Sequence, residues 1–243
     1  MKSSSTMIQK PTTMIILLIS MLGLHTTRGA NLRGLLVPPG FVPPEPTVYL
    51  IRHANKQAGS SATANLCSAG LYRADQLQQV FSGNQYEQDS VKFATPNRLF
   101  AYVYKKGDAQ RCEETLAPLH DSTGLYIHQV KPSSSTSINT EGADAIRNGE
   151  YGLNSAQVVL AAWEHVHLED MSLALGMTQD QKASLGCDPP FPDDHTFGNI
   201  YTFKYGNGPA QPPTSVTCHK EGITIPEEKY TDPSNTCAYN PYN

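Results

Sequence analysis

Short apolar segments rich in β-branched residues alternate with segments of helical periodicity over most of this 243-residue chain. The segment TVYLIR is apolar with a polar end, and SAQVVLAAW is apolar over consecutive positions, as in a strand buried on both faces. Between them, apolar residues recur at helical spacing after Ser68, which can cap a helix. This alternation predicts a single domain with a doubly wound three-layer α/β/α fold and a mostly parallel sheet.

The other elements follow the same alternation up to residue 204. Strands are expected at 47–52, 98–104, 125–130, 155–163 and 199–204, and helices at 68–81, 110–120, 141–148 and 168–175. The Ser/Thr-rich stretch 132–140 is expected to be a loop. Six prolines and no clear periodicity predict an irregular C-terminal tail over 206–243.

The amino terminus has the features of a secretory signal peptide. Lys2 and Lys10 precede the apolar run MIILLISMLGL, and the small residues Gly29 and Ala30 follow it. The alternative is a signal anchor, but a membrane span needs about 20 apolar residues and this run is shorter. We therefore expect residues 1–29 to be removed, 30–46 to form a Pro-rich leader, 47–205 to form the domain, and the mature protein to be secreted without a membrane anchor.

Composition excludes some partners. The formal charge of −4 falls to −7 when Lys2, Lys10 and Arg28 are removed with the signal peptide, and the chain has no cluster of lysine and arginine, so nucleic acid is not an expected partner. The five cysteines contain no C-x-x-C pair. In an oxidising compartment they predict two disulfides and one unpaired thiol, with the pairing left open.

Basic side chains stand where the predicted strands end. Arg52 and His53 end the first strand, His165 follows the strand 155–163, and Arg111 opens the helix after the second strand. In a parallel sheet these positions can meet at one edge. Two guanidinium groups and two imidazoles suit a phosphoryl group, because arginine binds its oxygens in planar forks and a neutral imidazole can attack phosphorus.

Two other interpretations of these residues are weaker. His165 and His167 with His195 and His219 could ligate a metal, but no spacing supplies a convincing third ligand, so neither a metal nor another cofactor is expected. Cys112 lies next to Arg111 in sequence, and a packed or disulfide-bonded cysteine is favoured there over a reactive thiol.

Several segments resemble the histidine phosphatase superfamily, also called phosphoglycerate-mutase-like. The segment VYLIRHANK (48–56) is similar to the family's Arg-His-Gly/Ala opening, and LCSAGLYRADQL (66–77) to the helix start that follows it. QRCEET (110–115) resembles the second arginine motif, VLAAWEH (159–165) the strand that carries the second histidine, and HTFGNIYTF (195–203) a closing strand. The motifs occur in the family's order and cover about residues 47 to 205.

The resemblance implies roles for individual residues. His53 would be the nucleophile that forms a phosphohistidine, and Arg52, Arg111 and His165 would bind the phosphoryl oxygens without a metal. The general acid is open: Val166 stands where one branch of the family has Asp. Candidates from elsewhere in the chain are Glu141, Glu150 and Glu169.

The expected function is therefore that of a secreted, metal-independent phosphomonoesterase acting on a small-molecule or protein phosphomonoester. A phosphoglycerate-mutase-type phosphoryl transfer is the alternative within the family. A catalytically inactive secreted binding protein on the same fold is the alternative from another class.

Overall fold

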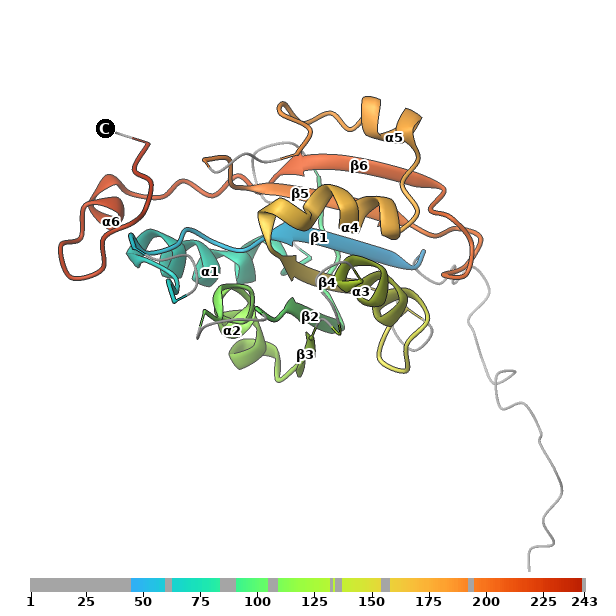
Figure 1. Cartoon of the computed structure of the whole chain (residues 1–243), viewed down its shortest axis with the longest axis horizontal. Coiled ribbons are helices and arrows are strands. Elements are labelled where there is room, and N and C mark those ends of the chain that lie inside the picture. The colour runs from blue at the N-terminus through green and yellow to red at the C-terminus, as the bar shows by residue number, and fades with distance from the viewer. Residues whose placement is uncertain are drawn as a thin grey trace, which may run out of the picture. The chain divides into compact units, whose positions relative to one another are not determined.

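A six-stranded sheet with the strand order β3-β2-β4-β1-β5-β6 forms the centre of the fold (Figure 1). The computed structural model describes residues 45–59, 63–83, 91–104, 109–131, 133, 137–153, 158–191 and 195–241. The predicted signal peptide and the leader up to residue 44 lie outside the described residues. Among the helices that are described, none combines the length and apolar character that a membrane span requires.

In chain order the elements are β1 (Thr47–Arg52), α1 (Ser68–Val80), β2 (Arg98–Tyr102), α2 (Arg111–Thr123), β3 (Ile127–Val130), α3 (Ile138–Arg147), β4 (Val158–Trp163), the 3-10 turn η2 (His165–His167), α4 (Leu168–Ala174), α5 (Gln179–Ala183), β5 (Asn199–Lys204), β6 (Ser215–Lys220) and α6 (Glu227–Tyr230). The strands and helices predicted between residues 47 and 204 all form, although α3 begins within the stretch expected to be a loop.

The sheet is mostly parallel, as predicted. Strands β1, β4, β2 and β3 run parallel, β5 is antiparallel to β1, and β6 is antiparallel to β5. The chain crosses outward from β1 through α1 and α2 to β3, and returns through α3 to β4. Because such crossovers are right-handed, α1 and α2 cover one face of the sheet, and α3 and α4 cover the other. The three-layer fold predicted from the alternation is thus confirmed.

The two central strands form the core. All six residues of β1 and all six of β4 are buried, as is usual for parallel strands covered on both faces. The indole of Trp163 is fully buried and donates its Nε1 proton to Asn139 Oδ1 of α3 at 3.0 Å. Gly142 of α3 lies directly against this ring, since a Cβ built there would be 2.5 Å from the indole. Only glycine permits this close approach of α3 to the sheet.

The prediction of an irregular tail over 206–243 is wrong for two segments. Ser215–Lys220 forms β6 at the edge of the sheet, and Glu227–Tyr230 forms the short helix α6. In β6, Val216 and Cys218 are buried while their neighbours are more exposed, which is the period-two pattern of an edge strand. This pattern spans only a few residues among prolines, so the surrounding composition concealed it.

The cysteines pair as two disulfides with one thiol left over, as predicted. Cys67 is bonded to Cys237, and Cys187 to Cys218, while Cys112 is a buried thiol. The first bond fixes the end of the tail to the residue that precedes α1. Tyr230 and Cys237 form a small apolar cluster with Cys67 and Ala69.

Replacing Cys67 and Cys237 together by serine should lower the free energy of unfolding by roughly 3–5 kcal/mol. The bond closes a loop with a sequence separation of 170 residues, so its loss releases a large entropy in the unfolded chain. The matched control replaces Cys187 and Cys218, whose separation is only 31 residues. Urea unfolding of both variants should show the larger loss for the first pair; a larger loss for the second pair would contradict this prediction.

Candidate active site

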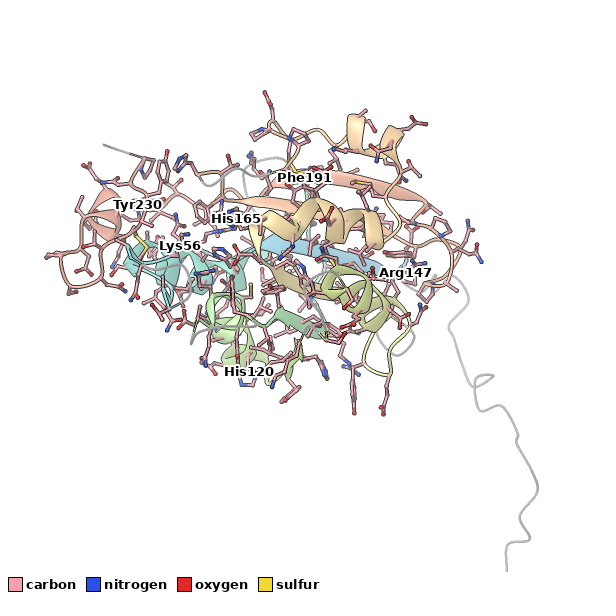
Figure 2. All side chains as sticks on the ribbon, viewed as in Figure 1. Lys56, His120, Arg147, His165, Phe191 and Tyr230 are labelled. Carbon is pink, nitrogen blue, oxygen red and sulfur yellow. A yellow bond between two sulfur atoms is a disulfide. The ribbon has the colours of Figure 1, made fainter. Side chains whose placement is uncertain are left out.

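The carboxyl ends of β1 and β4 bring the predicted site residues together. The register pairs Arg52 with Trp163, and the next residue, His53, donates its backbone N–H to the carbonyl of Trp163 at 3.0 Å. His165, two residues beyond Trp163, therefore lies beside His53, with ring centroids 5.9 Å apart. Figure 2 shows His165 near the start of α4, at this end of the sheet. The predicted meeting of the two strand ends is thus present.

The hydrogen bond of one ring nitrogen determines which tautomer His53 adopts. His53 Nδ1 lies 2.7 Å from the carbonyl oxygen of Ala54, and a carbonyl can only accept. The proton of the neutral ring is therefore on Nδ1, and Nε2 carries the lone pair. The Ala54 backbone is itself held, because its N–H donates to Thr115 Oγ1 of α2 at 2.8 Å. His53 thus presents a nucleophilic nitrogen on a fixed support.

Arg111 enters the site from the first turn of α2. Its Nη2 lies 2.8 Å from Glu164 Oε2, its Nη1 donates to the Ala64 carbonyl at 3.1 Å, and its Nε donates to the Tyr104 hydroxyl at 3.0 Å. The Tyr104 ring lies 4.3 Å from the guanidinium carbon, within cation–π range. The guanidinium is buried and held in one orientation by these contacts.

Arg52 is fixed by the segment before β5. Its Nη1 donates to the Thr196 carbonyl at 2.7 Å, and its guanidinium lies 3.8 Å from the centroid of the Phe197 ring. The positive charges of Arg52 and Arg111 both lower the pKa of His53.

Arg73 of α1, which is part of the helix motif, supports the backbone of His53. Its Nε and Nη2 make a bidentate pair with Glu221 at 2.6 and 2.7 Å, and its Nη1 lies 3.4 Å from the backbone carbonyl of His53. Both side chains are buried. No local sequence pattern pairs Arg73 with Glu221, because Glu221 comes from the tail expected to be irregular.

Glu164 lies among the predicted site residues, although sequence reasoning did not include it. Its carboxylate lies 2.6 Å from His165 Nδ1 and 3.4 Å from His53 Nε2 through Oε1, and contacts Arg111 through Oε2. We call His53, His165 and Arg111, with Glu164 between them, the cradle. The available signal was a charged residue directly at the end of an apolar strand.

The three predicted acid candidates have partners elsewhere. Glu141 on α3 accepts hydrogen bonds from Ser133, and Glu169 on α4 is ion-paired with Lys182 of α5. Glu150 follows α3 and lines a surface cavity of about 540 Å³ along β3, outside the cradle. Glu164, by contrast, contacts His53 directly.

Burial dominates the electrostatics of the cradle. Burial lowers the pKa of His53 to about 4; contacts with Glu164 oppose this shift, and the charges of Arg52 and Arg111 reinforce it. Burial alone would raise the pKa of Glu164, but the hydrogen bond from His165 holds that pKa well below its usual range. At neutral pH the resting cradle therefore contains a neutral His53 and an ionised Glu164.

Cys112 follows Arg111 but is not activated by it. The thiol is fully buried, and burial raises its pKa far above the usual value, with the Glu164 charge acting in the same direction. The expectation of a packed rather than a reactive cysteine is confirmed.

The histidines considered for a metal site do not gather. The rings of His167, His195 and His219 lie against Tyr102, Tyr239 and Phe93 respectively. In the part of the chain that the structure describes, one cluster has metal-ligand spacing: the donor atoms of His53, Glu164 and His165 lie within 4.8 Å of one another. The Arg111 guanidinium contacts the same carboxylate, so the cluster fits an anion better than a second cation.

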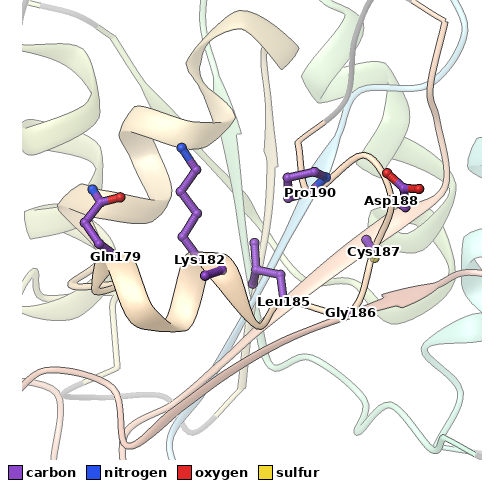
Figure 3. Close-up of a pocket in the computed structure, with 8 residues that line it drawn as sticks. Gln179, Lys182, Leu185, Gly186, Cys187, Asp188 and Pro190 are labelled. Atoms are coloured by element: carbon purple, nitrogen blue, oxygen red, sulfur yellow. The ribbon is translucent and has the colours of Figure 1, made fainter.

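Surface cavities are also present away from the cradle. One of about 430 Å³ lies between α5 and the loop before β5, lined by residues including Lys182, Leu185 and Pro190 (Figure 3). Its lining contains no nucleophile paired with a base, so it offers no comparable chemistry.

No protein-family model and no curated protein matches this chain. Among solved structures, a phosphohistidine phosphatase SixA from Agrobacterium tumefaciens is similar at 16% identity and a TM-score of 0.44, over 67% of this chain and 93% of that one. A SixA structure from Nakamurella multipartitia is similar at 13% identity and a TM-score of 0.46, over 73% of this chain and 96% of that one. An alpha-ribazole-5'-P phosphatase from Escherichia coli is similar at 11% identity and a TM-score of 0.42, over 74% of this chain and 98% of that one.

Acidification should destabilise the protein through His53. In the unfolded chain the His53 imidazole takes up a proton below about pH 6.5, whereas in the folded protein it stays neutral down to about pH 4. Between these two pH values protonation favours the unfolded chain, so the free energy of unfolding falls as the pH drops. The loss due to His53 should be about 3 kcal/mol. Glu164 adds a loss of the same sign below pH 4.5, because its folded pKa is also lowered.

Urea unfolding between pH 7 and pH 4 measures this dependence, with His53→Asn as the matched variant. We expect the stability of the variant to fall less steeply than that of the wild type between pH 6.5 and 4. Identical slopes for the two proteins would show that His53 is not the group responsible.

Proposed function

We propose that this protein is a phosphatase of the histidine phosphatase type, which hydrolyses phosphomonoesters through a phosphohistidine on His53. One observation carries the proposal: the lone pair of His53 Nε2 faces a buried position where His165 and Arg111 already hold two anionic oxygens. This combines an imidazole nucleophile with donors for the oxygens of the group under attack.

The proposed reaction has two steps. His53 Nε2 attacks phosphorus, and the bond to the leaving oxygen breaks. The proton stays on Nδ1 and keeps its hydrogen bond to the Ala54 carbonyl, which stabilises the positive charge shared by the ring. Arg52, Arg111 and His165 bind the phosphoryl oxygens and stabilise the charge that develops on them. Water then attacks phosphorus, the P–N bond breaks, and the electron pair returns to Nε2.

These contacts recognise the phosphoryl group that all monoesters share, so the substrate class is a small-molecule or protein phosphomonoester. The chemistry proposed here uses protein side chains for the charge stabilisation that a metal supplies in other phosphatases. Secretion remains part of the proposal. The signal-like amino terminus supports it, and the two disulfides are compatible with an oxidising compartment.

A second candidate is an inactive binding protein on the same fold. The position of Glu164 favours it, because a carboxylate that never left the cradle would exclude a phosphoryl group. A mutase-type transfer is a third possibility, distinguished by its product: an isomerised ester in place of inorganic phosphate.

Replacing His53 by alanine should reduce turnover of p-nitrophenyl phosphate by about 10³-fold or more, because the nucleophile is removed. The full chain, produced by secretion, is assayed for phosphate release with EDTA present. The matched control is His167→Ala, since His167 lies two residues beyond His165 with its ring against Tyr102. Its activity should stay within about threefold of the wild type.

A radiolabelled, acid-labile phosphoenzyme should form in the wild type and be absent from His53→Ala. Full activity in His53→Ala would contradict the assigned nucleophile. Wild-type protein without turnover would favour the inactive candidate, and activity abolished by EDTA would contradict metal independence.

A further inference from the structure

Glu164 occupies the position that a phosphoryl group needs. Reacting atoms in a near-attack geometry lie about 3–3.5 Å apart, and Glu164 Oε1 lies 3.4 Å from His53 Nε2. The same carboxylate uses the donors of His165 and Arg111 that would bind phosphoryl oxygens. A substrate and this carboxylate therefore compete for one site.

Access to the nucleophile leads to the same conclusion. The exposed fraction of His53 is 0%, so a phosphoryl group can reach Nε2 only if a neighbouring side chain moves. Glu164 lies on the Nε2 side of the ring, whereas the Nδ1 side is closed by the Ala54 backbone. In the chain, Glu164 lies between the end of β4 and the start of η2. Rotation about its side-chain torsions can withdraw the carboxylate while the strand stays in place.

Charge determines what happens to the displaced carboxylate. In the resting cradle its negative charge is balanced by surrounding donors. The titratable groups that face or electrostatically couple to Glu164 are His53 after β1, Tyr102 in β2, Tyr104 after β2, Arg111 and Cys112 in α2, and His165 in η2. A phosphoryl dianion takes the strongest of these donors and places two negative charges beside the carboxylate. Two anions that share a site cannot both remain ionised without a large penalty, so the carboxylate gains a proton.

We propose that Glu164 is an internal ligand of the cradle and the proton donor of the reaction: an incoming phosphoryl dianion displaces its carboxylate, the carboxyl takes up one proton, and that proton passes to the leaving oxygen. This inference rests on the proposed phosphatase function. It assigns the acid that Glu141, Glu150 and Glu169 do not supply.

The proton and electron balance of the cycle closes. Binding consumes one proton from solvent and forms the Glu164 carboxyl. As the His53–phosphorus bond forms, the ester P–O bond breaks with its electron pair on the leaving oxygen, which takes the carboxyl proton and departs as an alcohol. Glu164 then accepts a proton from the attacking water while the oxygen bonds to phosphorus. Release of the phosphate dianion lets Glu164 return to the cradle and lose that proton to solvent.

Anion binding tests the displacement without requiring turnover. Sulfate is a suitable probe, because it is a tetrahedral dianion that does not titrate between pH 5 and 8. Its affinity is measured by calorimetry on the full chain for wild type, Glu164→Gln and the matched control Glu169→Gln, whose carboxylate pairs with Lys182 outside the cradle.

For the wild type, sulfate binding should tighten as the pH falls, with uptake of a proton by Glu164. In Glu164→Gln, the slope of log Kd against pH should be smaller than in the wild type by about one, because this proton uptake is lost. The sulfate affinity of Glu164→Gln at pH 7 should be at least tenfold higher than that of the wild type, because the competing charge is gone. The Glu169→Gln protein should match the wild type. Equal slopes and affinities for all three proteins would overturn the proposal.

The leaving-group dependence tests the proton transfer. Glu164→Gln should lose about 10²–10³-fold in kcat on an alkyl phosphate such as glycerol phosphate, and less than tenfold on p-nitrophenyl phosphate, whose leaving group needs no proton. Glu164→Asp, which retains a carboxyl group, should recover part of the alkyl ester activity and guards against misfolding of the glutamine variant. Equal losses on both esters would overturn the role as proton donor.

These measurements separate the two levels of the assignment. If neither wild type nor any variant hydrolyses p-nitrophenyl phosphate, the proposed function fails, while the sulfate titration still decides whether Glu164 is an internal ligand. If His53→Ala alone abolishes turnover and Glu164→Gln changes neither binding nor leaving-group dependence, the function stands and this inference falls.

Discussion

Parallel pairing of β1 with β4 is the constraint on which the rest of the site depends. It places His53 beside the end of Trp163, so that Glu164 and His165 face the imidazole. A slip of this register by one residue would turn each strand side chain to the opposite face and separate the two histidines. The complete burial of both strands prevents such a slip, because it would also disrupt the core. The same packing that stabilises the sheet therefore positions the chemistry.

The C-terminal region supports this arrangement from the edge of the sheet. Strand β6 delivers Glu221 to Arg73, and Arg73 contacts the backbone of His53. The Cys67–Cys237 bond holds the last part of the tail beside the segment that follows His53, where Ala58 N–H donates to the Thr236 carbonyl at 2.9 Å. Removing one partner of a buried ion pair is strongly destabilising, so the tail is part of the support of the site.

Sequence reasoning predicted the parallel sheet, its helices and the meeting of Arg52, His53, Arg111 and His165, because these follow from local periodicity and from the geometry of strand ends. It could not predict β6, whose alternation is only a few residues long among prolines, nor the partner of Arg73, which is distant in the chain. It left the general acid open, with Glu141, Glu150 and Glu169 as candidates. Glu164 was missed because whether a carboxylate at a strand end faces solvent or an imidazole depends on side-chain packing that periodicity does not determine.

The position of Glu164 follows from the charge of the buried Arg111 guanidinium. Arg111 is buried, and a buried guanidinium without a counter-charge is costly. Glu164 supplies that charge together with acceptors for Arg111 and His165. In the proposed exchange, a phosphoryl group that replaces the carboxylate would preserve the ion pair with Arg111 while the carboxyl became neutral. Under that proposal, the residue that compensates the buried charge of Arg111 is also the residue that an anion displaces, and the exchange requires only a proton.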